Sequence, residues 1–462
     1  MRLTYLAHAS LLVEAGDVRL VTDPWLDGPT YLSAWWHFPA PVVHGAELRA
    51  THVYLTHEHA DHCHPPTLRA LPRSTTMLVG KYATRRFRDR LEALGFSVRE
   101  LPHGSPVRIG PLELTSYQYR ADDTALTISD GRATILDLND CLLRDRSLDE
   151  VLSRHTPIDL MLASFANAEA YPIVYSFEDP HEVPDWDDAS RFDTFLAKVR
   201  AVDPVAFAPF ASMFCFLEPS LRWLNDRIVS PAGLLARAGG EVRAAPLAMD
   251  PGDVWTPRGL ERRSEVDWSR RGEIIEGYAR THAADIAALA ARERIPGGRA
   301  ALESAFEAFF RGFCARVPAA LRGKLDLRVR FDVTGPEATT RWLSFDRGRL
   351  SLDAPASDDA WDVRIEVPAW PLWMTLTRQE WWQHLGISCR FRVTLRPGVR
   401  SREVWLWTML YLDDLGYLSP LAIASPRALS VLLRRHREVW QYVRDAASGR
   451  FGSRQLQGKY GG

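Results

Sequence analysis

The chain has 462 residues, of which 46% are hydrophobic and 25% charged, a composition typical of a globular protein with two or three domains. The formal net charge of -1 provides no overall basic field, so we expect neither nucleic acid nor a membrane surface as a partner. The sequence has no run of eighteen apolar residues and no signal-peptide pattern, and its five cysteines form no CxxC pair. These features predict a cytoplasmic location.

The first half of the chain predicts sheets that are covered by helices. Short strands bounded by Gly, Asp or Pro are expected at Leu3–Leu6, Ser10–Glu14, Val18–Thr22 and Thr51–Thr56. A helix is expected at Lys81–Leu94, followed by strands near Ser97–Leu101, Leu112–Tyr119, Leu126–Ser129 and Ala133–Leu138. Further along, the strands Leu160–Ser164 and Val205–Phe210 flank a helix at Ala189–Val202.

The pattern changes near residues 246–263, where Pro, Gly and charged residues dominate. Helices are expected at Ala283–Glu293 and Arg299–Val317, and the second of these places apolar residues on one face. Alternating apolar residues that begin at Leu325, Trp361 and Cys389 then predict half-buried strands of an antiparallel sheet. Two more helices are predicted at Val404–Leu415 and Pro426–Ala446, before a polar tail. We therefore divide the chain into residues 1–245, a helical linker region 246–323, and an α+β domain 324–462.

The strand Thr51–Thr56 leads directly into His57-Glu58-His59-Ala60-Asp61-His62, in which five of six residues are potential metal ligands. Side chains two residues apart point the same way in an extended segment, so His57 and His59 can bind one ion. A turn after His59 would direct Asp61 and His62 toward a second ion, about 3.5–4 Å away as in two-metal sites. Imidazole and carboxylate ligands together suit zinc, iron or manganese.

The HxHxDH motif after a short apolar strand resembles that of the metallo-β-lactamase superfamily. The segments Leu6–Leu12 and Val21–Trp25 also resemble the family's opening strands. This resemblance implies an α/β fold, the αββα metallo-β-lactamase sandwich, in residues 1–245. It places Asp140 where the family carries the aspartate that bridges two metals. Asp137 is a competing candidate, and a turn or helix-cap role for Asp140 stays open.

Within the superfamily, the chain most resembles the CMP-N-acetylneuraminate hydroxylase type. The resemblance depends on Asp137–Cys141, Ser164–Pro172 and Pro209–Asn225, and extends to Pro251–Asp253 and Ile387–Arg392. It implies a non-haem iron oxygenase that receives electrons through a Rieske iron–sulfur domain. This sequence lacks the Cys and His pairs of such a domain. Electrons would then come from a separate protein, of ferredoxin or Rieske type, or from the substrate.

The later histidines of the hydrolytic branches are also missing. Tyr117–Asp123 stands where one is expected, and Pro209–Ser212 stands where the other is expected. His103 is close in the sequence, but we expect it on a surface turn. A site with relatively more carboxylate favours iron over zinc. The preferred hypothesis is a mono- or di-iron oxygenase or hydroxylase acting on a small molecule. The alternative is a zinc or manganese hydrolase of a lactone, phosphodiester or amide, and a scaffold without activity is a third possibility.

Two further groups of residues are candidates for the site. His8 follows the first strand and, together with Asp61, is predicted to be catalytic; a structural histidine is the competing interpretation. Trp25, Trp36 and Tyr171 are predicted to line a substrate cleft, because loops at this edge of the fold form the pocket wall. A hydrophobic interface with the C-terminal domain is the alternative for these aromatic residues. The sequence does not identify the substrate or the oligomeric state.

Overall fold

The computed structural model describes residues 1–462 apart from 166–169, 185–187, 420–423, 439 and 441–462. Its N-terminal part contains two large sheets. The first sheet has the order β18 (Gly259–Glu261), β17 (Val254–Thr256), β1 (Arg2–Ala7), β2 (Ser10–Ala15), β3 (Val18–Thr22), β5 (His52–Leu55), β6 (Thr76–Gly80), β7 (Ser97–Leu101). The second has the order β16 (Ala245–Pro246), β14 (Ala206–Phe210), β12 (Leu160–Ser164), β11 (Thr134–Asn139), β10 (Asp123–Ser129), β9 (Leu112–Tyr119), β8 (Val107–Ile109).

The two sheets pack face to face with helices on both outer faces, which gives the predicted αββα arrangement. One core cluster joins Leu11 and Leu20 of the first sheet to Leu126 and Leu160 of the second. The outer face of the first sheet is covered by α1 (Pro65–Ala70) and α2 (Arg86–Ala93), and that of the second by α3 (Asp145–His155), α4 (Asp188–Val202) and α5 (Pro231–Glu241). The α/β fold class predicted from the sequence is confirmed.

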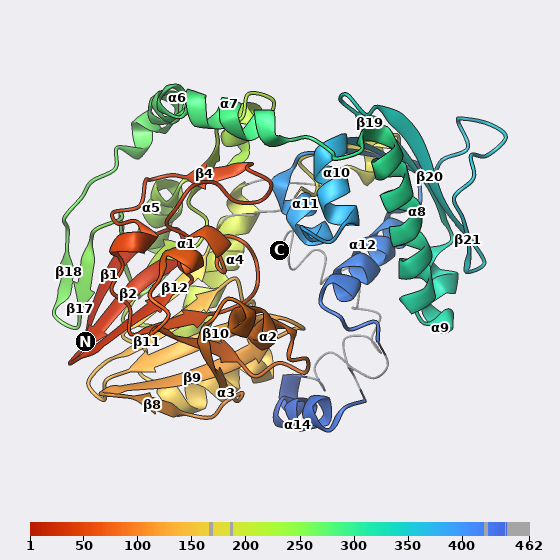
Figure 1. The fold of residues 1–462 in the computed structure, drawn as a ribbon. Helices are drawn as coiled ribbons and strands as arrows, with labels where there is room; N and C mark the ends of the chain where they lie inside the picture. Colours follow the sequence, from red (N-terminus) through yellow and green to blue (C-terminus); the bar gives the residue numbers. More distant parts are fainter. Residues whose placement is uncertain (166–169, 185–187, 420–423, 439, 441–462) are drawn as a thin grey trace.

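A helical connection leads to the C-terminal part. Figure 1 shows α6 (Arg271–Thr281) and α7 (Ala283–Arg292) running across the top of the two-sheet part before the chain enters α8 (Gly298–Arg316). The predicted apolar face of α8 is buried, because Leu302, Phe306 and Phe310 are fully inaccessible. Phe306 and Phe310 also contact Phe331 of the next sheet, so the helix covers that sheet.

The C-terminal sheet is mixed rather than antiparallel, which corrects the prediction. Its order is β13 (Tyr175–Phe177), β23 (Arg392–Leu395), β22 (Val363–Pro368), β19 (Leu327–Thr334), β20 (Thr339–Asp346), β21 (Arg349–Ser351). β19 pairs with β22 in parallel, and β13, from the N-terminal half of the chain, pairs in parallel with β23. Alternating apolar residues identify which face of a strand is buried, but they contain no information on the direction of the neighbouring strand.

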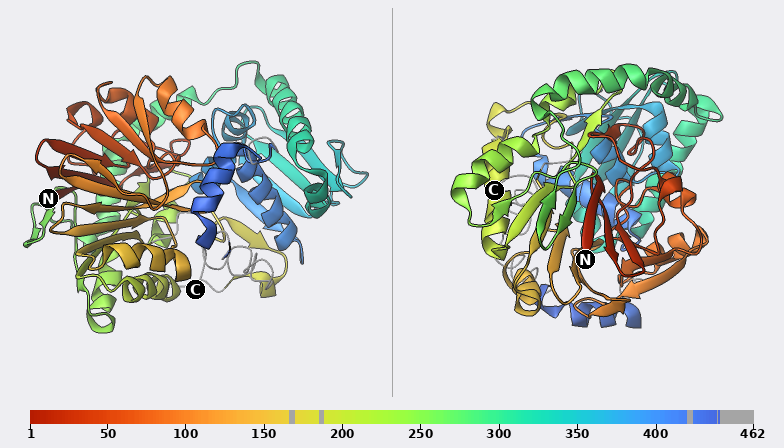
Figure 2. Two further views of the ribbon diagram at one scale, coloured as in Figure 1. Left: turned by 90° about the horizontal axis from the view of Figure 1, so that it is seen from below. Right: turned by 90° about the vertical axis from the view of Figure 1, so that its left-hand side faces the viewer.

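The remaining helices lie at the C-terminal sheet or beside the two-sheet part (Figures 1 and 2). They are α9 (Ala319–Arg322), α10 (Ala369–Leu376), α11 (Trp382–Ser388), α12 (Arg400–Asp414) and α14 (Pro426–Arg434). A two-stranded sheet, β4 (Trp35–His37) with β15 (Phe214–Phe216), completes the fold. Across the part of the chain that is described, no helix is long and apolar enough to cross a bilayer. The predicted polar tail lies outside the described residues.

Candidate metal centre

The HEHADH segment forms a tight turn at the carboxyl end of β5. His62 and Cys63 both donate their backbone N–H to the carbonyl oxygen of His59, at 3.0 and 2.7 Å. The chain then enters α1, where His64 is the N-cap and Pro65 the first helical residue. This turn separates the potential ligands into two adjacent groups of three residues, and within each group the ligand atoms lie within 4.8 Å of one another.

The first group contains His8, Asp61 and His62, all buried. Oδ2 of Asp61 lies 3.0 Å from Nε2 of His8 and 3.3 Å from Nε2 of His62. His8 comes from the turn between β1 and β2, 53 residues before Asp61 in the sequence. The structure therefore places the predicted catalytic His8 among the candidate ligands.

The second group contains His57, His59 and Asp140. Nε2 of His57 lies 2.7 Å from Nδ1 of His59 and 3.9 Å from Oδ2 of Asp140. The same oxygen of Asp140 lies 3.6 Å from Nε2 of His62 in the first group. Asp140 thus stands between the two groups, as a bridging carboxylate would. Asp137 belongs to neither group: it is fully buried, and both its oxygens lack a hydrogen-bond partner.

A buried polar network holds the histidines with one nitrogen facing the groups. Asp23 accepts hydrogen bonds from the Thr56 backbone N–H, the Thr56 hydroxyl and Nδ1 of His62, at 2.8, 2.7 and 3.0 Å, and a further bond from Asn139. Since the Thr56 hydroxyl donates to Asp23, it accepts from Nδ1 of His57 at 2.9 Å. In His57 and His62 a proton is therefore held on Nδ1, so that Nε2 is the nitrogen that faces the groups and can bind a metal.

The residues fit a metal ion on two observations. Nε2 of His62 is buried without a well-directed hydrogen bond, and carboxylate oxygens of Asp61 and Asp140 lie 3.3 and 3.6 Å from it. Buried polar atoms are rarely left unpaired, so this nitrogen has the position of a ligand. The surrounding carboxylate oxygens supply the remaining donors, and this combination of imidazole and carboxylate suits zinc, iron or manganese.

Before any metal binds, the two groups are strongly coupled electrostatically. Burial would raise the pKa of Asp61, but the charges of His62 and His8 hold it well below its usual value. Burial would lower the pKa of His62, but Asp61 and Asp23 raise it well above its usual value. Burial would also raise the pKa of Asp140, but the proximity and charge of His62, together with the charge of His59, lower it below its usual value. The carboxylates of the site are therefore ionised and ready to bind a cation.

The three predicted substrate residues lie in different surroundings. Trp25 is fully buried and packs edge-on to His8, next to the first group, with 5.2 Å between the two ring centroids. Trp36 is buried in a cluster with Phe38, Cys215, Leu217, Ile275 and Ala279, on the side of α6. Tyr171 lies under the Arg400 guanidinium, 3.6 Å from its ring centroid, against the C-terminal part. A role in substrate binding stays a prediction for all three.

His103 is not on the surface, which corrects the expectation. Its side chain is buried; Nδ1 accepts a hydrogen bond from the backbone N–H of Gln118 at 2.8 Å, and Nε2 lies 3.6 Å from Glu150. These contacts fix the turn before β8 against β9 and α3. The turn signal of Pro102-His103-Gly104 predicted the backbone shape correctly but not the packing of α3 over it.

Several residues at the centre were not identified from the sequence. Asp23 and Asn139 lie in segments that resemble the family, but only the fold brings them to His62. Tyr31 donates a hydrogen bond from its hydroxyl to Oδ1 of Asp61. His384, from α11 in the C-terminal part, has its ring centroid 6.1 Å from that of His59. No local pattern predicts the contact of Tyr31 with Asp61 or that of His384 with His59, because the partners lie far apart in the sequence.

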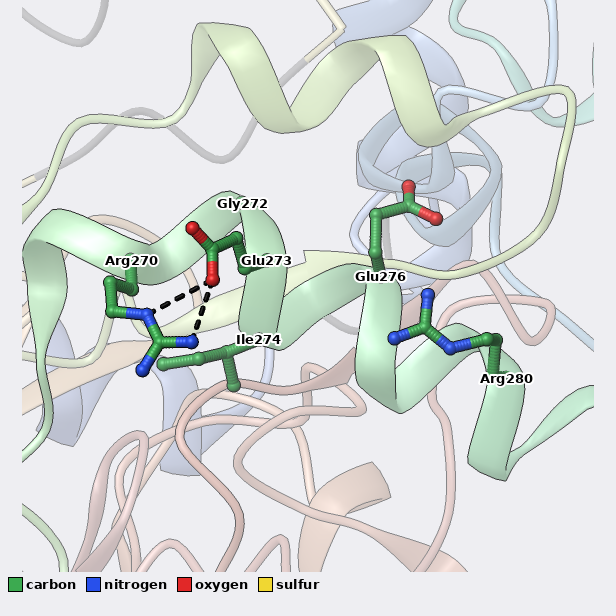
Figure 3. A pocket seen from close by; sticks show the side chains of 6 residues that line it. All are labelled: Arg270, Gly272, Glu273, Ile274, Glu276 and Arg280. Carbon is green, nitrogen blue, oxygen red and sulfur yellow. Dashed lines mark hydrogen bonds and ion pairs between the residues drawn. The ribbon is translucent and has the colours of Figure 1, made fainter.

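A separate hollow lies on the surface of α6 (Figure 3). Its lining residues are Arg270, Gly272, Glu273, Ile274, Glu276 and Arg280. Arg270 there forms an ion pair with Glu273 at 2.7 Å, between two exposed side chains. None of these residues belongs to the candidate ligand groups, so we do not assign the hollow to the metal centre.

Comparison with known proteins agrees with this description. Residues 2–132 match the family described as beta-lactamase superfamily domain. The match covers residues 2–132 of the N-terminal part, and the predicted resemblance to this superfamily is confirmed.

Two curated relatives are similar to this chain. The chain is 26% identical over 432 residues to a protein of Mycolicibacterium smegmatis named as a Rieske 2Fe-2S iron-sulfur protein, covering 85% of this chain and 81% of the relative. It is 27% identical over 246 residues to the cytidine monophosphate-N-acetylneuraminic acid hydroxylase of Asterias rubens, covering 49% of this chain and 36% of the relative. Two other curated relatives align with this chain over 252 residues. The alignment spans about half of each relative's length, 48%.

Among solved structures, the chain is similar to CmlA, a diiron beta-hydroxylase from Streptomyces venezuelae. The TM-score is 0.38 with 18% identity, over 57% of this chain and 54% of that one.

Proposed function

We propose that this protein is a non-haem iron oxygenase or hydroxylase, with one or two iron ions, that acts on a small molecule. The observation that carries the proposal is the composition of the two adjacent groups, each of which contains an aspartate. The sequence has no histidine at either of the two positions where hydrolytic relatives carry one. Carboxylate oxygens are harder donors than imidazole and favour iron over zinc. The hydroxylase named among the relatives supports the same choice.

In this proposal His57, His59 and Asp140 hold one ion, and His8, Asp61 and His62 hold a second. Iron bound there would supply the activation of dioxygen. Asp23 and Thr56 keep the ligand nitrogens of His62 and His57 turned toward the ions. The rings of Trp25, Trp35 and Phe214 lie within 6.3 Å of His8 (centroid to centroid) and exclude water from that side of the centre.

An oxygenase also needs electrons. All five cysteines of this chain are buried as free thiols, and only Cys63 has a histidine next to it in the sequence. We therefore propose a separate electron-transfer protein of ferredoxin or Rieske type as the donor. The Rieske name of the mycobacterial relative supports a donor of that kind.

A two-metal hydrolase is the second candidate. The single Asp140 oxygen that lies 3.6 and 3.9 Å from histidines of both groups favours it, because a bridging carboxylate is typical of two-metal hydrolytic sites. In that case zinc or manganese would activate water, and Asp61 would orient it toward a lactone, phosphodiester or amide.

The two functions differ in the metal that the protein retains. The test is to purify the protein from iron-supplemented and zinc-supplemented cultures, measure bound metal by elemental analysis, and follow absorbance when the reduced protein meets O2. We expect one or two irons and an optical change that depends on O2. Two tightly bound zinc ions together with esterase activity would refute the oxygenase. The exposed His436 lies outside both groups, so a His436→Ala variant is the control and should retain the same metal content as the unmodified protein.

A further inference from the structure

Three consecutive residues beside the metal centre adopt left-handed backbone conformations. Tyr31, Leu32 and Ser33 have φ values of 50, 56 and 63°, although none of them is glycine. Non-glycine residues rarely occupy this region, and a run of three is maintained only where the surroundings hold it. Such strain is concentrated at functional sites, so we asked which contacts maintain the loop and which side chain it presents.

The loop is held both by its own backbone and by a contact from the C-terminal part. Arg390 donates a hydrogen bond to the carbonyl oxygen of Leu32 at 2.8 Å, while its Nη2 pairs with Glu293 at 2.7 Å. Trp35 closes the loop through two backbone hydrogen bonds with Thr30, at 3.0 and 3.2 Å. A residue 358 positions away in the sequence thus fixes a loop of the N-terminal domain.

The side chain that the loop presents is that of Tyr31. Its ring is buried edge-on against Trp35 and His384, with centroid distances of 4.8 and 5.3 Å. Its hydroxyl donates to Oδ1 of Asp61. The other oxygen of Asp61, Oδ2, is the one that lies 3.0 Å from His8 and 3.3 Å from His62. The two oxygens therefore have separate partners, Tyr31 on one side and the ligand group on the other.

We propose that Tyr31 is a positioning residue of the metal centre, which fixes the Asp61 carboxylate so that a single oxygen faces His8 and His62. The inference depends on the proposed metal function, because it assigns Tyr31 a role toward one of the two ions. Removing the hydroxyl frees Oδ1 and lets the carboxylate rotate. Hydrogen-bond partners of metal ligands typically change metal affinity by about 10- to 100-fold.

The proposal also gives the C-terminal part a role at the centre. Arg390 holds Leu32, and Leu32 adjoins Tyr31, so loss of the Arg390 contact lets the loop relax and withdraw the hydroxyl. The double variant Arg390→Met/Glu293→Met removes the contact without leaving an unpaired buried charge. We expect it to weaken the same ion as Tyr31→Phe does, by a smaller factor.

The test is a cobalt(II) titration of metal-free protein, followed by visible absorbance and by elemental analysis. We expect Tyr31→Phe to weaken the cobalt held by His8, Asp61 and His62 by 10- to 100-fold, while the cobalt held by His57, His59 and Asp140 binds as in wild type. Tyr117→Phe is the matched control, because it removes a buried hydroxyl that bonds His155 at 2.8 Å, away from both groups.

Wild-type affinity for every cobalt in Tyr31→Phe, with an unchanged melting temperature, would overturn the positioning role. Equal loss of both cobalt ions would overturn it as well, since the hydroxyl contacts only the first group. A wild-type protein that binds no cobalt, zinc or iron would instead refute the proposed function, and this inference with it. The titration does not use iron or O2, so a hydrolase would give the same expected result for Tyr31→Phe.

Discussion

Replacing Asp23 by asparagine tests whether the network behind the ligands holds the metal centre together. In the folded protein, Oδ1 of Asp23 accepts from the Thr56 backbone N–H, and Oδ2 accepts from the Thr56 hydroxyl, His62 and Asn139. An asparagine can keep its oxygen at one of these positions only. The Oδ2 position satisfies three donors, so the oxygen stays there and the NH2 group takes the Oδ1 position, where the buried Thr56 backbone N–H loses its acceptor.

The expected loss of stability follows from the number of buried donors that are left without an acceptor. A buried donor left without a partner costs about 1–3 kcal/mol, so the free energy of unfolding should fall by about that amount. The His62 ring also loses the carboxylate that orients it, which lowers metal affinity by about 10- to 100-fold. The assay is urea unfolding of metal-free protein, with metal content measured in parallel.

Asp17→Asn is the control for Asp23→Asn, because Asp17 is exposed at the turn between β2 and β3. If Asp23→Asn kept both the wild-type unfolding midpoint and the wild-type metal content, the network would not support the centre, and the reasoning would be refuted.

Three other predictions concern the ligands, the pH dependence and the C-terminal core. His59→Ala and Asp61→Asn should each abolish metal binding or activity, and full activity in either variant, measured beside elemental analysis, would refute the site. Burial raises the pKa of Asp414 to about 7, so its contribution to stability is full below about pH 4 and falls as pH rises to 7. Asp414→Asn should therefore stabilise the protein at pH 8 by about 2–4 kcal/mol and have little effect at pH 4, and equal urea midpoints for the two proteins at pH 8 would contradict this. Phe310→Ala should lower the free energy of unfolding by about 3–5 kcal/mol because the ring is fully buried in the C-terminal core, with the metal content of the folded protein unchanged.

The sequence by itself determined the elements that form through local interactions. The strand before His57 was predicted because a short β-rich segment is bounded by turn residues, and β5 lies there. The apolar face of α8 was predicted from helical spacing. The residues predicted to form it are all buried: Leu302, Phe306, Phe309, Phe310 and Phe313. Close spacing also made the HEHADH segment recognisable, since its potential ligands lie within six residues of one another.

Only the tertiary structure decided which residues surround that segment. His8 approaches Asp61 because β1 and β5 lie in one sheet, and Asp23 approaches His62 because β3 pairs with β5. Tyr31, Arg390 and His384 reach the centre through the packing of the C-terminal part. Periodicity records whether a side chain faces the core, but it does not record which distant segment lies opposite. The hydrogen-bond partners of the ligands therefore depend on sheet order and domain packing, which a local pattern does not contain.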